Sequence, residues 1–548
     1  FIDSWECGSQ NWSGNFIAEF QKRRGYDVMT YLPLLAGFPI ESAKKSEKVL
    51  HDVRQTISEL VSDVFIKVMR DNAHKYGMEL IAESVAPTFV SDGMRHFQIT
   101  DRPTGEFWFR SPTHDKPTDM LDAISGAHIY GKNIVQAEGF TQLRTNWDEH
   151  PAMLKSMLDR HFALGMNKLY FHVFVQHPNL NQSPGTTLSG MGLFFQRTQT
   201  WWKQGKAFVD YISRCQTMLQ YGKPVVDVAV FTGEEIPRRA FTPEKLVPFL
   251  PGLIGPKRLE NEKIRLANVG QPLMETPFGV NFAANTFKIE NWVNPLNGYA
   301  YDSFNKEVFL SAKAENGKMK LESGMEYRVV IFPDMKKYSE ETLAKIQELK
   351  NAGVIIPNLP FSEENFNRYK LEQDVIAPEN IAWAHRSGEE ADLFFISNQE
   401  EREREVEISF RISGRFPELW QAMDGTVSKP KNVTFREGRT LVTLKLHPYG
   451  SVFVVIPLKS NTEDNVVDEL NTHVTSLDLN WTITFERNNQ QLVSRELKSW
   501  SENKNPLIKY YSGTAIYKTN FTQNDISGKY FLNLGVVHNL ATVCVNGI

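Results

Sequence analysis

Two glutamates stand where predicted buried strands end, and aromatic residues lie close to both in the sequence. Glu6 ends the run Asp3-Ser4-Trp5-Glu6, and Glu138 lies within Val135-Gln136-Ala137-Glu138-Gly139-Phe140. Two carboxyl groups that face one cleft can cleave a glycosidic bond, because one protonates the leaving oxygen while the other acts as base or nucleophile. Most of the 65 acidic residues should be solvated surface groups. The position at a strand end is what makes this pair a catalytic candidate.

Other polar residues stand at or inside apolar runs. Glu83 follows Met78-Glu79-Leu80-Ile81-Ala82, at the end of another predicted strand. Glu106 lies inside Gly105-Glu106-Phe107-Trp108-Phe109, where it could contact a sugar hydroxyl, bind a hard cation through oxygen, or simply belong to an edge strand. His172 follows Leu169-Tyr170-Phe171, and a histidine in such a run is more often a core residue than a ligand. We keep both interpretations of His172 open.

Alternating strands and helices are predicted to position these residues over residues 1–221. From Leu50 to Val68 apolar residues recur three and four apart, and Gly77 ends that predicted helix. A further helix is predicted to begin at Pro151. Such alternation indicates βαβ units and a parallel sheet. The fold class is therefore α/β, either a (β/α)8 barrel or a doubly wound sheet, and no glycine-rich phosphate turn favours the second.

Residues 222–380 repeat the α/β pattern. Buried strands are predicted at residues 225–231 and 327–333, and Ser339 is a good cap for the helix that follows it. Apolar residues and a final glycine at position 353 complete that helix pattern. This segment is predicted to be a flavodoxin-like α/β domain.

The remainder of the chain is predicted to be all-β. Between residues 381 and 460 the apolar pattern changes to period two, which is typical of a β-sandwich. A polar linker separates it from a second all-β unit at residues 476–548, which looks truncated. Strands of that unit are expected at residues 481–485, 515–517 and 530–534.

Length and composition limit the class of protein. The 548 residues suggest several domains, and 41% hydrophobic with 23% charged residues excludes a disordered chain. Because 61 basic residues face 65 acidic ones, nucleic-acid binding is not expected. No apolar run reaches the ~18 residues of a membrane helix. The three cysteines are too far apart in the sequence for a disulfide framework or a metal-binding motif.

The stretches around these candidates resemble glycoside hydrolase family 106, the α-L-rhamnosidases. The matching stretches extend over nearly the whole chain. The stretch at residues 532–548 resembles a sugar-binding β-sandwich of β-galactosidase-type enzymes. The matching stretches are DSWE (3–6), RGYDVMTYLP (24–33), GEFWF (105–109), SGAHIYGKNIVQAEGFT (125–141), QTWW (199–202), GKPVVDVAVFTGEEIPRR (222–239), HRSGEEADLFFISN (385–398) and LNLGVVHNLATVCVNGI (532–548).

The resemblance implies a (β/α)8 barrel with appended α/β and β-sandwich domains, and hydrolysis of terminal α-L-rhamnose with inversion. On this pattern Glu6 matches the general acid, Glu138 matches the general base, and Glu106 matches a residue linked to a Ca²⁺ ion that contacts the rhamnose hydroxyls. The residues expected to line the sugar site are Trp5, Glu83, Trp108 and His172.

The family barrel would begin before residue 1, so residues 1–221 would be its second half. We therefore expect a fragment, inactive by itself, of a periplasmic or secreted enzyme that acts on rhamnose-containing oligosaccharides or glycosides; the sequence does not specify its oligomeric state. Two alternatives stay open. One is a retaining, β-galactosidase-like enzyme, whose two carboxylates would be more closely spaced. The other is a non-catalytic carbohydrate-binding protein. Loss of Glu6 or Glu138 would have favoured that second alternative, and both residues are present.

Overall fold

The computed structural model describes residues 1–3, 12–83, 90–111, 117–143, 145–179, 181–182, 184–267, 292–334, 338–459, 475–523 and 530–547. The chain divides into two compact units, residues 1–197 with 204–466 and residues 198–203 with 467–548. Within the described ranges, no helix combines the length and apolar character that crossing a membrane requires.

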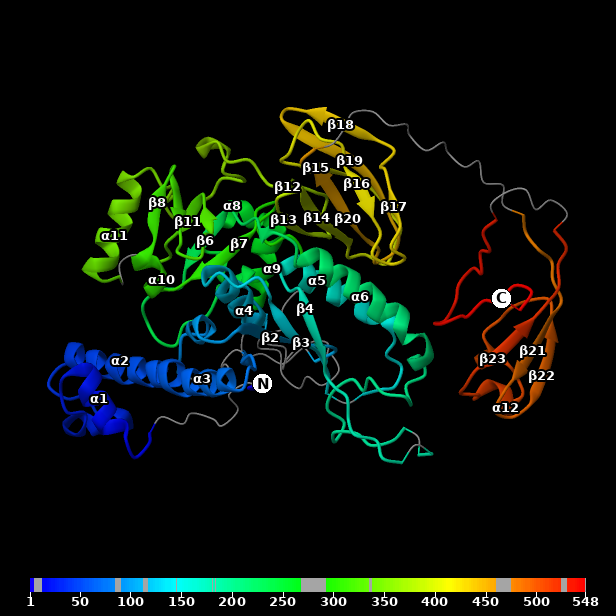
Figure 1. Ribbon diagram of the computed structural model, residues 1–548, viewed down its shortest axis with the longest axis horizontal. Coiled ribbons are helices and arrows are strands. Elements are labelled where there is room, and N and C mark those ends of the chain that lie inside the picture. The colour runs from blue at the N-terminus through cyan, green and yellow to red at the C-terminus, as the bar shows by residue number, and fades with distance from the viewer. Residues whose placement is uncertain are drawn as a thin grey trace. The chain divides into compact units, whose positions relative to one another are not determined.

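A parallel sheet carries the candidate residues of the first unit (Figure 1). Its strands, in spatial as well as chain order, are β1 (Ile81–Glu83), β2 (Arg102–Trp108), β3 (Gln136–Thr141) and β4 (Lys168–Phe171). Ile2 forms a parallel bridge to Ala82, so the chain start extends the sheet at its β1 edge. Strands that follow one another without a reversal are typical of a singly wound barrel rather than a doubly wound sheet. The predicted α/β class is confirmed, and the described strands form an open sheet rather than a closed barrel.

Helices connect these strands, as the alternating pattern predicts. One helix in this part of the chain begins where the sequence predicts, because Pro151 is the first residue of α5, and Gly165 caps its end. The helical elements of this region are α1 (Phe16–Arg24), η1 (Met29–Ala36), α2 (Ala43–Glu59), η2 (Leu60–Ile66), α3 (Lys67–Lys75), η3 (Arg95–Gln98), α4 (Pro117–Ile129), α5 (Pro151–Leu164), η4 (Trp202–Gln204) and α6 (Gly205–Leu219).

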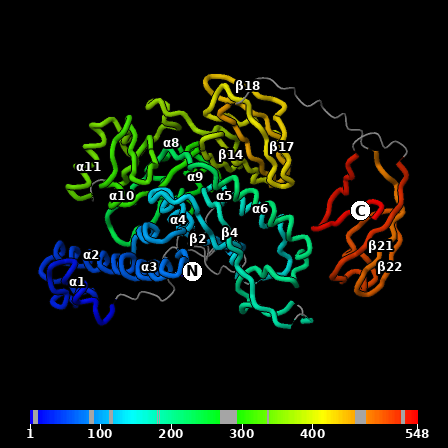
Figure 2. The backbone as a smooth tube through the Cα atoms, in the orientation of Figure 1, coloured from blue at the N-terminus to red at the C-terminus, as the bar shows by residue number. Residues whose placement is uncertain are grey.

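The long predicted helix before β1 forms, but its apolar face does not stay buried. Elements α2, η2 and α3 follow one another directly and trace one continuous helical stretch (Figure 2). Val53 and Ile57 are buried, whereas Val64, Phe65 and Val68 are 43%, 38% and 51% exposed. Segment η2 is a π-helix, whose wider turns rotate later residues away from the face that the earlier ones occupy. The even 3–4 spacing in the sequence therefore overestimates the buried face.

Residues 222–380, here called the second domain, are built on a parallel sheet in the order β11-β6-β7. Ser339 caps its main helix by accepting a hydrogen bond from the Thr342 amide, as predicted. Beside β11, a single parallel bridge joins Val329 to Ile355. The elements of this domain are β5 (Lys223–Pro224), β6 (Val228–Phe231), α7 (Pro243–Leu246), α8 (Pro251–Ile254), α9 (Pro256–Ala267), β7 (Tyr301–Phe304), α10 (Lys306–Ser311), β8 (Lys313–Glu315), β9 (Lys318–Lys320), β10 (Glu326–Tyr327), β11 (Val329–Ile331), α11 (Glu340–Asn351), η7 (Asn367–Tyr369) and β12 (Val375–Ile376).

Two antiparallel sheets follow, in the orders β12-β15-β19-β18 and β17-β16-β20-β14-β13-β5. Alternate side chains of both sheets are buried in one core that includes Phe394, Ile396, Ile408 and Phe410. Their remaining strands are β13 (Ile381–Ser387), β14 (Ala391–Asn398), β15 (Arg404–Phe410), β16 (Glu418–Trp420), β17 (Val427–Ser428), β18 (Val433–Arg436), β19 (Arg439–Leu446) and β20 (Ser451–Pro457).

The second unit has a small antiparallel sheet in the order β22-β21-β23. The strand expected at residues 530–534 does not form, and Tyr530 and Phe531 are 55% and 77% exposed. An apolar run becomes a strand only where a neighbouring strand completes its backbone hydrogen bonds, which a sequence pattern alone does not supply. The elements of this unit are β21 (Trp481–Phe485), β22 (Gln490–Ser494), η8 (Trp500–Glu502), α12 (Pro506–Lys509) and β23 (Ala515–Lys518).

Candidate active site

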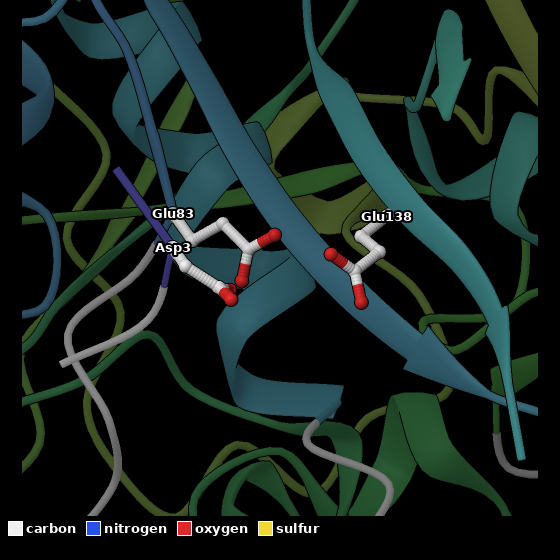
Figure 3. Close-up of side chains that lie close together, drawn as sticks. All are labelled: Asp3, Glu83 and Glu138. Carbon is white, nitrogen blue, oxygen red and sulfur yellow. The ribbon is translucent and has the colours of Figure 1, made fainter. Parts of the chain in front are cut away.

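Three carboxylates meet at the carboxyl end of the parallel sheet. Glu83 ends β1, Glu138 lies in β3, and Asp3 follows the bridge residue Ile2. Asp3 and Glu83 lie beside each other, and Glu138 points toward them from the other side of β2 (Figure 3). One carboxylate oxygen of each lies within 4.8 Å of those of the other two.

Strand register explains why these residues share one face of the sheet. Glu83 pairs with Thr104, and Glu106 pairs with Glu138 in parallel ladders. Side chains two residues apart on a strand point the same way, so Thr104 and Glu106 share a face, and Glu83 and Glu138 share it with them. Glu106 is 6% exposed and is therefore a buried residue of an inner strand, which excludes the edge-strand interpretation.

Glu83 is the most deeply buried acid of the three. Its residue is 4% exposed, and its Oε1 atom has no hydrogen-bond partner within the described part of the chain. Burial, followed by the charges of Glu138, Glu106 and Asp3, raises the pKa of Glu83 well above its ordinary value. A carboxyl group in this setting is stable only if it holds a proton or faces a cation.

Glu138 has a more polar environment. The Thr141 hydroxyl donates a hydrogen bond of 3.1 Å to Glu138 Oε1, and His172 Nε2 lies 3.8 Å from the same oxygen. Burial raises the pKa of Glu138 above its ordinary value, the nearby His172 opposes that rise, and Asp3 adds to it. The carboxylate is thus polarised by two neighbours while its side chain keeps 15% of its surface exposed, which suits a general base.

His172 belongs to the site rather than to the hydrophobic core. Its amide donates to the Gly139 carbonyl at 3.0 Å, next to Glu138, and its ring faces the Glu138 carboxylate. Gly192 lies against the ring, because a Cβ atom there would stand 2.6 Å from His172 Nδ1. A side chain at position 192 would therefore displace the imidazole. The ligand interpretation of His172 fits this geometry better than the core interpretation.

Of the remaining predicted site residues, the structure describes Trp108 alone. Trp5 and Glu6 lie outside the described residues. Trp108 is 7% exposed and ends β2, where the register with β3 shifts after Phe107. Sequence reasoning missed Asp3 and Thr141 as members of the site. The signal for Asp3 was its place in the DSWE stretch, and for Thr141 it was the three-residue spacing from Glu138.

Comparison with known proteins decides the family. The family model described as alpha-L-rhamnosidase matches residues 1–253 and 361–436, which is more than half of the chain. The chain belongs to glycoside hydrolase family 106. It is a glycoside hydrolase by family, as the sequence motifs indicate, and the family assignment made from those motifs is confirmed.

Two relatives extend this result. A Formosa agariphila protein named "Putative beta-glucuronidase" is 35% identical over 472 residues, which is 85% of this chain and 39% of that protein. The structure of the rhamnosidase from Novosphingobium sp. PP1Y matches with a TM-score of 0.73 at 23% identity, over 92% of this chain and 49% of that one. The latter shows a shared fold. The family 106 chain described here spans about half, or less, of the length of these relatives.

The acidic cluster is chemically suited to a hard cation. Carboxylate oxygens are the ligands that Ca²⁺ prefers, and among the described residues none donates a hydrogen bond to the buried Oε1 atom of Glu83. Among the described residues, the one group of side chains close enough to share an ion is Asp3, Glu83 and Glu138, and it does not include Glu106.

Proposed function

We propose that the chain carries the catalytic residues of an inverting α-L-rhamnosidase, and that its β1–β4 sheet is half of the (β/α)8 barrel of that enzyme. The observation that supports this best is the position of Glu138. It lies inside the parallel strand β3, in the QAEGFT stretch, two residues beyond the level of Glu83 at the carboxyl end of β1, and it contacts Thr141 and His172. Catalytic groups of such barrels lie toward the carboxyl ends of the strands.

In the proposed mechanism Glu138 removes a proton from the attacking water, and Glu6 protonates the oxygen of the leaving group. The water attacks the anomeric carbon directly, so that the configuration is inverted. Inversion needs room for that water, and it predicts a separation of roughly 6.5–9.5 Å between the Glu6 and Glu138 carboxyls. Thr141 and His172 keep the Glu138 carboxylate oriented toward the water.

We also propose that the site takes a Ca²⁺ ion, which would polarise and orient the rhamnose hydroxyls. Asp3 and Glu83 are the residues suited to hold it. Glu106, on the same face of the sheet in β2, would contact the same hydroxyls or the ion. In this role the buried Glu83 carboxylate is balanced by the ion rather than by a proton.

One relative is named as a glucuronidase, whereas the family model that matches this chain is described as alpha-L-rhamnosidase. We therefore favour terminal α-L-rhamnose of oligosaccharides or plant glycosides as the substrate, handled by a periplasmic or secreted enzyme.

A panel of 4-nitrophenyl glycosides tests the proposal on the full-length natural protein. We expect hydrolysis of the α-L-rhamnoside and not of the β-D-galactoside or β-D-glucuronide, and a β-rhamnose product in the first NMR spectra. Preferred hydrolysis of the galactoside with a retained anomer would establish the retaining alternative. Binding of rhamnose without hydrolysis of any glycoside would establish the non-catalytic one.

A further inference from the structure

Helix α4 carries a buried polar stripe that faces the second domain. Every residue from Asp119 to Ile129 is buried, because α4 lies between β2 of the parallel sheet and β7 of the second domain (Figure 1). Four polar residues recur every third position, each next to the one before, in a slanted stripe that winds along the helix: Asp119, Asp122, Ser125 and His128. A helix surrounded by protein needs a partner for each such group.

The second domain supplies those partners at both ends of the stripe. His128 Nδ1 lies 2.9 Å from an Asp302 carboxylate oxygen, and the Ser303 amide donates to Ser125 Oγ at 2.9 Å. At the start of the helix, Arg239 forms ion pairs with both Asp119 and Asp122. The Ala240 amide adds a hydrogen bond of 2.6 Å to Asp122. One guanidinium thus holds the first two turns of α4.

The opposite side of α4 lies against the strand that carries Glu106. A Cβ atom at Gly105 would stand 2.8 Å from Met120 Cα and 2.7 Å from Met120 Sδ. The helix therefore touches the backbone of β2 one residue before Glu106. Asp119 is also close enough to contribute to the raised pKa of Glu83. A shift of the first turn of α4 would therefore move the backbone next to Glu106 and change the charge close to Glu83.

The same segment of the second domain also holds the chain after β1. Asp92 and Arg238 form a parallel bridge, with the Gly93 amide 3.0 Å from the Arg238 carbonyl and the Arg238 amide 3.1 Å from the Ser91 carbonyl. Arg238 Nε donates to Asp92 at 2.8 Å. Gly93 leaves space that the Arg239 and Asp122 side chains occupy. The loop after β1 and the helix after β2 thus meet at one pair of arginines.

We propose that Arg239, in the GEEIPRR stretch of the second domain, is a positioning residue of the active site. It acts through α4, holding Glu106 and Glu83 in the geometry that binds the sugar, so the second domain is part of the catalytic apparatus. This inference rests on the proposed function. Arginine suits the role because its planar fork reaches two carboxylates at once, whereas lysine presents a single point charge. Removing it leaves two buried carboxylates without their cation.

The test compares Arg239→Met with Arg239→Lys and with the control Arg411→Met in the full-length protein. Arg411 also bridges two buried carboxylates, Asp227 at 2.8 Å and Asp374 at 3.3 Å, but it lies between the second domain and the β-sandwich. Thermal melts show how much each change destabilises the fold, and assays are run well below the lowest melting temperature. The readouts are kcat and KM on 4-nitrophenyl α-L-rhamnoside, and hydrogen–deuterium exchange of peptides from residues 102–111 and 117–129.

We expect Arg239→Met to lower kcat/KM by about 10- to 100-fold, because a misplacement of about 1 Å can have an effect of that size. Arg239→Lys should fall between it and the wild type, and Arg411→Met should stay within about twofold at a similar loss of melting temperature. Exchange in both peptides should rise in Arg239→Met alone.

Equal losses of activity in the two methionine variants, or unchanged exchange in Arg239→Met, would overturn the assignment. If the wild type does not hydrolyse the rhamnoside, the proposed function fails, and the exchange data still decide whether Arg239 holds the sheet.

Discussion

Glu83 and Glu138 approach each other across β2, with carboxylate oxygens within 4.8 Å. In the chain 54 residues lie between them, and their strands, β1 and β3, are not neighbours in the sheet. Two carboxylates at this distance do not both ionise readily in a buried site. The pKa of each is raised, Glu83 the more strongly because it is the more buried. Either a proton or a cation must accompany this pair, and the two possibilities predict different behaviour.

Removal of the proposed cation should disable the enzyme reversibly. We expect dialysis against a chelator to lower both the rhamnosidase activity and the melting temperature, and added Ca²⁺ to restore both, because the buried Glu83 carboxylate would lose its counter-charge. Glu83→Gln should need a higher Ca²⁺ concentration for the same activity. Full activity after dialysis, with no calcium found by elemental analysis, would instead make Glu83 a proton-bearing residue and Glu106 a direct ligand of the sugar.

Replacement of the proposed catalytic pair should separate their roles. We expect Glu6→Gln and Glu138→Gln each to lower turnover of unactivated rhamnosides by about 10²–10⁴-fold. A good leaving group, such as 2,4-dinitrophenolate, should rescue Glu6→Gln because it departs without protonation. It should not rescue Glu138→Gln, which lacks the base. Equal rescue of both variants would contradict the assignment of acid and base.

The acid limb of the pH–rate profile should report Glu138. A base works only when ionised, so activity should rise with pH through a value above the ordinary 4.5, because burial raises the Glu138 pKa. His172 opposes that rise, and His172→Gln should therefore move the acid limb to higher pH. The control is His74→Gln, since His74 pairs with Asp101 before β2 begins. A limb that stays in place or moves down in His172→Gln would exclude this coupling.

Stability should fall at alkaline pH through a buried histidine of the β-sandwich. His385 Nδ1 lies 2.8 Å from Asp374 and Nε2 lies 3.3 Å from Asp392. Burial alone would lower its pKa, but the two carboxylates outweigh burial and raise the pKa of His385 to about 9. A raised pKa stabilises the fold fully below the unfolded value of 6.5, and the contribution is lost as pH rises through about 9.

The matching measurement compares unfolding of the wild type and His385→Gln at pH 6 and pH 9.5. Between these two pH values we expect the free energy of unfolding to fall by on the order of 1–3 kcal/mol more in the wild type than in His385→Gln. Activity at pH 6 should be little affected, because His385 lies outside the site. A parallel loss in both proteins would show that another group titrates.

Much of the site was predictable because local patterns determine strands and their facing residues. Alternating strand and helix signals identified β1, β3 and β4, the first two of which carry Glu83 and Glu138. Glu83 ends β1 as predicted, whereas Glu138 lies inside β3, because that strand continues to Thr141. The motif stretches identified the family. These properties depend on residues close in the chain, whose periodicity and turn chemistry act before any tertiary contact forms.

Only the tertiary structure decided which of these residues meet. Asp3 joins Glu83 through a parallel bridge at Ile2, and the stripe of α4 finds Arg239 more than a hundred residues away. The exposed apolar residues of η2 and α3 and the missing strand at residues 530–534 have the same origin, because a run of apolar residues does not specify which surface will cover it. Register, charge pairing and burial arise between distant segments, and the local sequence around any one residue carries no record of its partner.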